Sequence, residues 1–130
     1  NSIHAVLCVG ENLEQFENDQ SLDVVLNQLE SALIEGVNPA LLTVAYEPVW
    51  AIGTGKVASI DDIKPVFAVI KQTMLDKFGA KGNNVAILYG GSVNADNSKE
   101  IFSVEELNGV LVGGASLDAT SFVDIARNSY

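Results

Sequence analysis

The sequence predicts an α/β fold built around a parallel sheet. Four short apolar segments alternate along the chain with segments in which apolar residues recur at helical spacing. The apolar segments are nearly continuous and rich in β-branched residues, which is typical of strands covered on both faces. Such alternation indicates βαβ units with right-handed crossovers. We therefore expect four βα units in one domain spanning residues 1–130.

The first strand, the first helix and the second strand are expected in the first third of the chain. Residues 3–9 (IHAVLCV) form an apolar, strand-like run in which the small Cys8 is expected to be a buried packing residue. A helix is expected over residues 21–35, with Ser21 as its N-cap. Its apolar stripe consists of Leu22, Val25, Leu26, Leu29 and Leu33. Residues 41–45 (LLTVA) are the next strand.

A glycine-containing loop of unusual length, residues 46–57, precedes the second long helix. The apolar stripe of this helix consists of Ile63, Phe67, Ile70, Met74 and Phe78. Ser59 and Asp62 have the spacing of a capping box at its start. Pro65 conflicts with that start, because a proline in the second turn removes a backbone donor. Two alternatives follow: the helix begins after this box, or it bends at Pro65.

Two more short strands and two helices complete the pattern. The strands are expected at residues 85–89 and 110–112, each followed at once by Gly-Gly, with a short helix between them. A last helix is expected over residues 120–128. Its buried side chains would be Phe122, Val123 and either Ile125 or Ala126.

Four parallel strands are compatible with two architectures. They can form a small doubly wound sheet, for example a flavodoxin-like sheet that binds a flavin, or half of an eight-stranded barrel. In both architectures, ligands bind beyond the carboxyl ends of the strands. Periodicity alone does not separate the two.

Composition and charge narrow the classes of partner. The chain has 7 Lys and Arg against 17 Asp and Glu, a formal net charge of −10 that repels nucleic-acid phosphates and anionic membranes. No apolar run reaches the ~20 residues of a membrane helix. With one cysteine and one histidine we expect no metal, no other cofactor and a reducing, cytoplasmic setting. The sequence starts at Asn1 without a secretory signal pattern, which indicates a start in mid-protein.

The residues directly after each strand are the candidates for chemistry. Glu47 follows an apolar strand, where loss of water would raise its affinity for a proton and suit it to general-base catalysis. Glycine and serine residues follow the other strands, and their backbone N–H groups can bind an anion without a basic side chain. They are Gly10, Gly90, Gly91, Ser92, Gly113 and Gly114. Residues 48–58 have a stiff start and a glycine-bearing centre, which indicates a hinged lid.

These motifs together resemble those of the triosephosphate isomerase family. Residues 45–56 (AYEPVWAIGTGK) closely resemble its twelve-residue signature, and three further motifs match in order and spacing. These are CVGE at 8–11, YGGS at 89–92 and LVGGASL at 111–117. The resemblance covers essentially the whole chain. It implies the C-terminal half of a TIM (β/α)8 barrel of about 250 residues, from the fifth strand onward.

The resemblance implies a role for each motif. Glu47 would be the base that interconverts glyceraldehyde 3-phosphate and dihydroxyacetone phosphate, a step of glycolysis, through an enediolate. Ile52 and Leu111 would press on its carboxylate and remove water from it. The substrate phosphate would be bound by the backbone N–H groups of Gly53, Ser92, Gly113 and Gly114.

A closing lid is also implied by the resemblance. Its hinges and tip would be Pro48, Val49, Trp50, Ala51, Ile52, Gly53, Thr54, Gly55, Lys56, Val57 and Ala58. Glu11 would contact Trp50 while the lid is open. Tyr89 and Ser92 would hold the closed lid through its backbone.

The resemblance further implies what these residues would need from elsewhere. The family uses an asparagine and a lysine after its first strand and a neutral histidine after its fourth, whereas His4 lies at the opposite end of a strand from the chemistry. We therefore expect the isolated chain to be essentially inactive. It would pair with the missing N-terminal half or with a second copy of itself, and the full-length family forms homodimers. The alternative is a non-catalytic half-barrel that binds phosphate or self-assembles.

Overall fold

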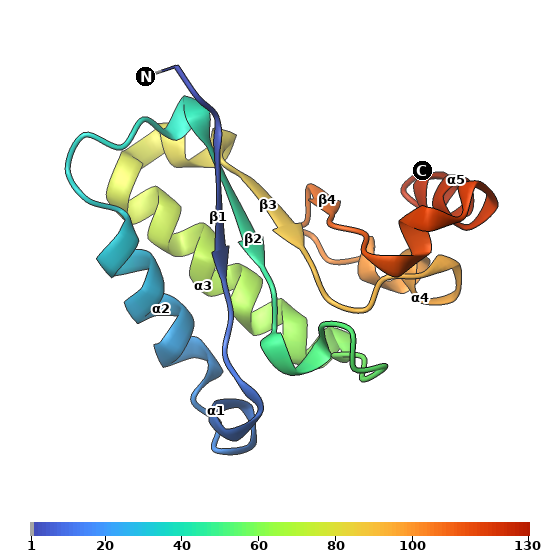
Figure 1. The fold of residues 1–130 in the computed structure, drawn as a ribbon. Coiled ribbons are helices and arrows are strands. Elements are labelled where there is room, and N and C mark those ends of the chain that lie inside the picture. The colour runs from blue at the N-terminus through green and yellow to red at the C-terminus, as the bar shows by residue number, and fades with distance from the viewer. Residues whose placement is uncertain (1) are drawn as a thin grey trace.

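A four-stranded parallel sheet is the centre of the fold. The computed structural model describes residues 2–130 and is shown in Figure 1. The strands are β1 (Ala5–Val9), β2 (Leu42–Tyr46), β3 (Ala86–Tyr89) and β4 (Gly109–Val110). Each strand pairs in parallel with the next one along the chain, in the order β1-β2-β3-β4. The predicted α/β fold with four parallel strands is confirmed.

The order of the strands separates the two predicted architectures. A doubly wound sheet reverses its order at a switch point, as in the flavodoxin-like order 2-1-3-4-5. The consecutive order seen here has no reversal, so the doubly wound and flavodoxin-like alternatives are wrong. Consecutive parallel strands are the arrangement of a (β/α)8 barrel, of which these four would form half.

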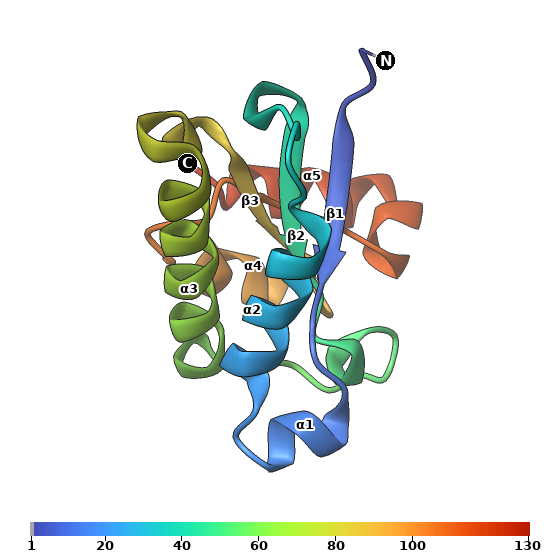
Figure 2. The same cartoon turned by 90° about the vertical axis from the view of Figure 1, so that its left-hand side faces the viewer.

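Five helices and four 3₁₀ turns connect the strands of the described chain. The helices are α1 (Leu13–Glu17), α2 (Ser21–Ala32), α3 (Ile60–Phe78), α4 (Ala95–Ile101) and α5 (Ala119–Arg127). The 3₁₀ turns are η1 (Pro39–Leu41), η2 (Val49–Ala51), η3 (Gly79–Asn84) and η4 (Gly114–Leu117). Figure 2 shows α2 and α3 side by side on one face of the sheet. Within residues 2–130, no helix combines the length and apolarity needed to cross a bilayer.

Helix α2 differs from its prediction at both ends. Its N-cap is Gln20, which makes no side-chain cap bond, so the predicted cap Ser21 is instead the first helical residue. The shift follows from the short helix α1, which was not predicted. The chain passes from α1 to α2 through Asp19, whose φ is 56°. At the other end the helix stops at Ala32, three residues earlier than expected. Leu33 follows as a buried residue in a non-helical conformation.

Helix α3 begins at the predicted capping box. The Asp62 N–H donates to Ser59 Oγ at 3.2 Å, and the Ser59 N–H donates to Asp62 Oδ2 at 2.9 Å. The helix begins at Ile60 and continues without interruption past Pro65, so the alternative of a later start is wrong. Pro65 leaves the Asp61 carbonyl without its helical donor, and the box offsets this loss at the first turn.

The main core lies between the sheet and the pair of helices α2 and α3. Alternate residues of a strand point to opposite faces, and Val44 and Tyr46 of β2 point toward α3. The Tyr46 ring meets the ring of Phe67 edge-on, with centroids 6.2 Å apart. Fully buried apolar side chains fill this layer, among them Val25, Leu29, Ile63, Phe67, Ile70, Met74 and Ile87.

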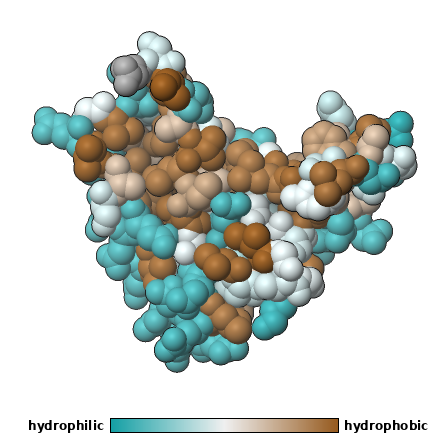
Figure 3. Space-filling view, viewed as in Figure 1, coloured by the Kyte–Doolittle hydropathy of each residue, from teal (hydrophilic) through white to brown (hydrophobic). Residues whose placement is uncertain are grey.

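The opposite face of the sheet is open, and this overturns the prediction that residues 3–9 are a buried strand. Val6 is 51% exposed, and the thiol-bearing Cys8, expected to be buried, is also exposed. The reason is position, because β1 is an edge strand and the side chains on this face of it are exposed. Figure 3 shows the resulting apolar surface over the area in which the strands lie.

The C-terminal elements are also less buried than predicted. Strand β4 has only two residues instead of 110–112, although the Leu111 N–H still donates to the Tyr89 carbonyl at 2.8 Å. Helix α5 starts one residue before the predicted range, at Ala119, with Asp118 as its N-cap. Of its predicted core residues, Ile125 is buried, whereas Phe122, Val123 and Ala126 are exposed. These apolar side chains lie, like β4, at the second edge of the sheet.

Because the Cys8 thiol is exposed on the open face, the rate at which it reacts reports the charge of the groups near it. Partial burial and the nearby Glu47 carboxylate raise the pKa of the Cys8 thiol. A Glu47→Gln substitution removes the negative charge, so the pKa falls and more thiolate is present at pH 8. We expect alkylation of Cys8 by iodoacetamide to accelerate roughly two- to fivefold, measured by mass spectrometry. Glu14→Gln on α1 is the control, and an equal rate in all three proteins would contradict the proximity of the two groups.

Candidate active site

The loops that follow the strands enclose a pocket of about 530 Å³. Because the strands are parallel, their carboxyl ends meet at one edge of the sheet, where ligands of such folds bind. Contributions come from the ends of β2, β3 and β4 and from the loop after β2. The lining residues are Glu47, Ile52, Gly53, Gly90, Gly91, Ser92, Val93, Asn94, Leu111, Val112, Gly113, Gly114 and Ala115.

Nine of the residues proposed from the sequence come together in this pocket. They are Glu47, Ile52, Gly53, Gly90, Gly91, Ser92, Leu111, Gly113 and Gly114. The other predicted lid residues do not line it. Those that are buried are Pro48, Trp50, Ala51 and Ala58, and those that are exposed are Val49, Thr54, Gly55, Lys56 and Val57. Tyr89 is completely buried beneath the loop that it precedes.

Glu47 lies directly after β2, where two glycines make room for it. Its N–H donates to the Val9 carbonyl at 2.7 Å, which continues the pairing of β1 with β2. A side chain at Gly10 would overlap the Glu47 carbonyl oxygen. A Cβ at Gly90 would lie 2.7 Å from Glu47 Cγ and Oε1. The backbone and the half-buried side chain of Glu47 are therefore each fixed by a neighbour without a side chain.

A glutamine on α2 holds one of these glycines. Gln28 Oε1 accepts from the Gly10 N–H at 2.8 Å, and Gln28 Nε2 donates to the Gly10 carbonyl at 3.0 Å. One side-chain amide therefore satisfies both backbone groups of Gly10, at the edge of β1 that faces away from β2. Gln28 was not predicted from the sequence, because nothing in the helical pattern distinguishes it from a solvated polar residue.

Backbone N–H groups of the pocket provide donors for an anion. Within residues 2–130, the N–H groups of Gly53, Ser92, Gly113 and Gly114 donate no hydrogen bond to the protein. The lining contains no lysine, arginine or histidine from the described chain. An anion in this pocket would therefore meet neutral donors, as at phosphate sites built from glycine-rich loops.

The segment after Glu47 forms a compact loop joined to the pocket at its base. It starts with the turn η2 and passes through Gly53 and Gly55, whose φ values are 66° and 76°. The Thr54 hydroxyl donates to the Trp50 carbonyl at 2.7 Å and closes the loop upon itself. The Ser92 hydroxyl donates to the Ala51 carbonyl at 2.6 Å. This bond links the loop after β2 to the loop after β3.

The Glu11 carboxylate is a buried centre of hydrogen bonds behind this loop. Glu11 is fully buried, and its Oε1 accepts from Trp50 Nε1 at 2.9 Å and from the Tyr46 hydroxyl at 3.1 Å. The Trp50 ring stacks on Phe16 of α1 at a centroid distance of 4.2 Å. Burial, reinforced by the Glu11 charge, raises the pKa of Tyr46 far above its usual range. Trp50 thus makes the Glu11 contact that the family resemblance associates with an open lid.

Tyr89 brings a second buried hydroxyl to the site. Its oxygen lies against Gly91 and near the Ala58 backbone at the end of the segment after Glu47, but it makes no hydrogen bond of good geometry in the described chain. Burial raises the pKa of Tyr89 to about 12, so the group is a neutral hydroxyl at physiological pH. A buried hydroxyl without a hydrogen-bond partner costs free energy, so a neighbouring segment that supplied a partner would be stabilised in that position.

Four lining residues were not predicted from the sequence: Val93, Asn94, Val112 and Ala115. Val112 and Ala115 lie within a recognised motif, and Val93 and Asn94 are the two residues that follow another. The signal that could have found them is this adjacency, because a glycine pair after a strand exposes the backbone of the residues around it.

The buried Glu11 makes a testable demand on stability. Glu11→Leu leaves the Tyr46 hydroxyl and the Trp50 N–H buried without an acceptor, at about 1–3 kcal/mol each. We expect the free energy of unfolding to fall by about 2–5 kcal/mol in urea denaturation. The same substitution at the exposed Glu17 is the control, with an expected change within about 0.5 kcal/mol. Equal effects at the two positions would show that the hydrogen bonds of Glu11 contribute nothing.

Comparison with known proteins agrees with this geometry. The sequence profile of the triosephosphate isomerase family matches residues 1–129. The triosephosphate isomerase of a Bradyrhizobium species is 46% identical over 123 residues, which are 95% of this chain and 49% of that protein. The triosephosphate isomerase of a Ruegeria species is 49% identical over 118 residues, which are 91% of this chain and 48% of that protein.

A solved structure gives the same result for the fold. The crystal structure of triosephosphate isomerase from Bartonella henselae matches with a TM-score of 0.85 and 40% sequence identity, over 95% of this chain and 50% of that one. The chain thus spans about half the length of the curated relatives that it matches. The consecutive parallel sheet is the arrangement of half of their barrel. The chain belongs to the triosephosphate isomerase family.

Proposed function

We propose that this chain carries the base and the phosphate-binding part of an isomerase that interconverts glyceraldehyde 3-phosphate and dihydroxyacetone phosphate. The observation that supports this most is the composition of one pocket. Glu47 lines it together with four residues whose backbone N–H groups are unengaged, Gly53, Ser92, Gly113 and Gly114. A carboxylate beside an uncharged anion site suits proton abstraction from a small phosphorylated substrate.

The proton transfer at carbon is assigned to Glu47. Its carboxylate takes a proton from the carbon next to the substrate carbonyl, and the electron pair of that C–H bond forms the enediolate. The same carboxyl group then returns the proton to the neighbouring carbon, so that Glu47 ends each turnover as it began. Contact with Gly90 at the carboxylate and with Gly10 at the backbone fixes the direction from which it acts.

The phosphate is bound by neutral donors, and the lid excludes water. Hydrogen bonds from backbone N–H groups to a charged phosphate are stronger than those to neutral acceptors. The loop over residues 48–58 would close on the phosphate, and Ile52 and Leu111 would then cover the carboxylate. Closure would offer the unpartnered hydroxyl of Tyr89 a backbone partner in the lid. The Glu11–Trp50 bond fits the open state of this cycle.

The same chemistry explains why we propose that these 130 residues alone are essentially inactive. A second proton must move between the two substrate oxygens, and the enediolate charge needs electrostatic stabilisation. Among the lining residues of the described chain, Glu47 is the one titratable group. Each electrostatic donor absent from such a site costs about 10²–10³-fold in rate. The remaining groups would come from a complementary N-terminal half-barrel.

The test is an isomerase assay with glyceraldehyde 3-phosphate, coupled to detection of dihydroxyacetone phosphate. We expect the chain alone to lie at the level of its Glu47→Gln variant, which controls for contaminating host enzyme. With the N-terminal half of the Bradyrhizobium relative present, we expect activity, and Glu47→Gln in that complex lowers kcat by about 10²–10⁴-fold. Glu47-dependent turnover by the chain alone would overturn its inactivity. A folded complex whose activity ignores Glu47 would overturn the proposed function.

A non-catalytic, self-assembling half-barrel is the second candidate, favoured by the open side of the sheet. The exposed edge of β1 borders a groove of about 610 Å³ lined by Leu7, Cys8, Val9, Asn27, Gln28, Ser31 and Ala32. Exposed edges and apolar faces invite pairing. Two copies would bring two net charges of −10 together, which disfavours self-pairing against pairing with a less acidic half.

Light scattering of the purified chain distinguishes these partners. We expect little self-association at low ionic strength and more in high salt, where the like charges are screened. Addition of the N-terminal half should give a one-to-one complex at either salt concentration. A stable homodimer at low salt would favour the second candidate, and a compact monomer that ignores both salt and the added half would contradict both forms of pairing.

A further inference from the structure

The loop between β3 and α4 touches three parts of the candidate site. Gly90 packs against the Glu47 carboxylate, Ser92 contributes an unengaged N–H to the pocket, and the Ser92 hydroxyl donates to the Ala51 carbonyl of the lid segment at 2.6 Å. A loop with these three duties needs a defined conformation. Two of its residues are glycines, which supply little rigidity of their own.

Both peptide groups that flank Ser92 are held by their carbonyl oxygens. The Gly91 carbonyl accepts from the Val93 N–H at 2.9 Å. The Ser92 carbonyl accepts from Asn97 Nδ2 at 2.7 Å. In a trans peptide the N–H points opposite to the carbonyl of the same group. Fixing the Gly91 carbonyl therefore also fixes the direction of the Ser92 N–H. Fixing the Ser92 carbonyl likewise fixes the Val93 N–H, which is the donor to the Gly91 carbonyl.

The Asn97 side chain is itself held in one orientation. Its Oδ1 accepts from the Asn94 N–H at 2.9 Å, and its backbone N–H donates to Asn94 Oδ1 at 3.0 Å. This reciprocal pair is the capping box of α4. Because Oδ1 is engaged with a donor, the amide cannot flip, and Nδ2 remains directed at the Ser92 carbonyl.

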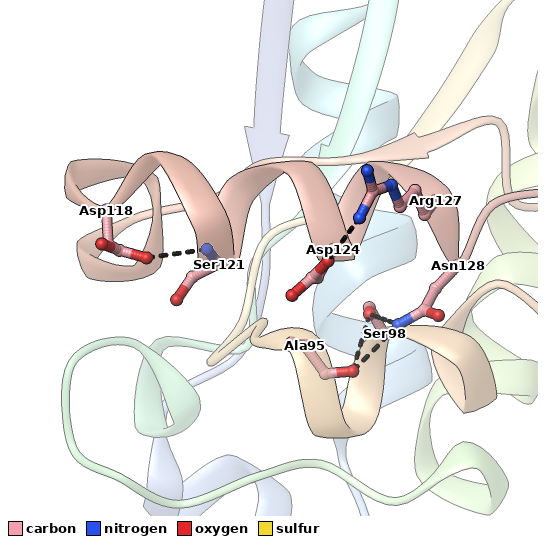
Figure 4. Close-up of polar contacts among 7 residues, drawn as sticks. All are labelled: Ala95, Ser98, Asp118, Ser121, Asp124, Arg127 and Asn128. Carbon is pink, nitrogen blue, oxygen red and sulfur yellow. Dashed lines mark hydrogen bonds and ion pairs between the residues drawn. The ribbon is translucent and has the colours of Figure 1, made fainter.

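The helix that carries Asn97 is fastened to the helix that follows the second glycine pair. Asn128 Nδ2, at the end of α5, donates to the Ala95 carbonyl and to Ser98 Oγ, both at 2.9 Å, as Figure 4 shows. Ser98 is completely buried at this junction. This junction joins the start of α4, which follows the loop of Ser92, to the end of α5.

From this geometry we infer that Asn97 is a positioning residue for phosphate binding, acting through Ser92. This inference rests on the proposed function and adds a residue outside the pocket to it. Asn97 does not line the pocket, and its amide reaches the ligand only through the loop that it orients. Loss of the amide would release the Ser92 carbonyl and, in the same peptide group, the Val93 N–H that holds the Gly91 carbonyl. The Ser92 N–H would then lose its fixed direction and the anion site would weaken, while Glu47 keeps its contacts with Gly10 and Gly90.

The expected signature is a loss of affinity with little loss of chemistry. In the complex that turns over substrate, Asn97→Ala should raise KM for glyceraldehyde 3-phosphate and the inhibition constant of inorganic phosphate by about tenfold each, with kcat within about threefold. A merely structural role would lower stability without this split between KM and kcat.

Asn128→Ala is the matched control. It removes the two hydrogen bonds that join α5 to α4, outside the pocket, which costs stability of the same kind, but leaves the Asn97 amide bonded to the Ser92 carbonyl. We expect comparable melting temperatures for the two variants, with the phosphate inhibition constant of Asn128→Ala within about twofold of the parent. Equal inhibition constants for the two variants would overturn the inference.

A second pair covers the outcome in which the alanine variants fail to fold. Asn97→Asp keeps the acceptor for the Asn94 N–H and loses only the donor to Ser92, whereas Asn128→Asp adds the same charge outside the pocket, loses its donor to α4 and leaves the Asn97–Ser92 bond intact. We expect Asn97→Asp to weaken phosphate inhibition at least threefold more than Asn128→Asp, and equal weakening would overturn the role of Asn97. If the parent complex shows Glu47-dependent turnover and phosphate inhibition, the proposed function stands whichever way this comparison falls.

Discussion

The position of Glu47 depends on the close approach of three chain segments at the ends of β1, β2 and β3. Gly10 lies against its backbone, at a distance that excludes any side chain, and Gly90 lies against its carboxylate, where a side chain would displace that of Glu47. The pairing of β1 with β2 and of β2 with β3 brings these glycines to Glu47 from both sides. The amide of Gln28 then holds Gly10, so that even a helix on the far side of β1 contributes to the placement of one carboxylate.

The remainder of the site follows from the need to bind an anion in an acidic protein. A chain with a net charge of −10 that uses backbone N–H groups needs no basic side chain in the pocket. The requirement is shifted to conformation, because an N–H group has no reach of its own and must be aimed by the surrounding backbone. Short polar side chains do this aiming: Ser92 bonds to the lid segment, and Asn97 bonds to Ser92.

The sequence predicted what depends on local patterns and on motifs. The order of strands and helices and the capping box at Ser59 are local, and the structure agrees with them. Glu47 and the glycine and serine residues at the strand ends were found because each follows a strand, whereas Ile52, Gly53 and Leu111 were found from the family resemblance. The prediction that Cys8 is buried was wrong, because an apolar sequence indicates that a strand can be covered but does not show which element covers it. Helix α1 was not predicted because its five residues make little more than a single turn. The contacts of Gln28 were not predicted because its partner, Gly10, is distant in the sequence.

The Glu11–Trp50 contact has a spectroscopic consequence. Trp50 is the sole tryptophan of the chain and lies at the root of the loop after Glu47, with its ring on Phe16 and its N–H on a buried carboxylate. Indole emission responds to the polarity around the ring and to charged neighbours, and here it comes from a single fluorophore. The protein therefore carries an intrinsic optical reporter at the root of this loop, and its emission describes the loop without any attached label.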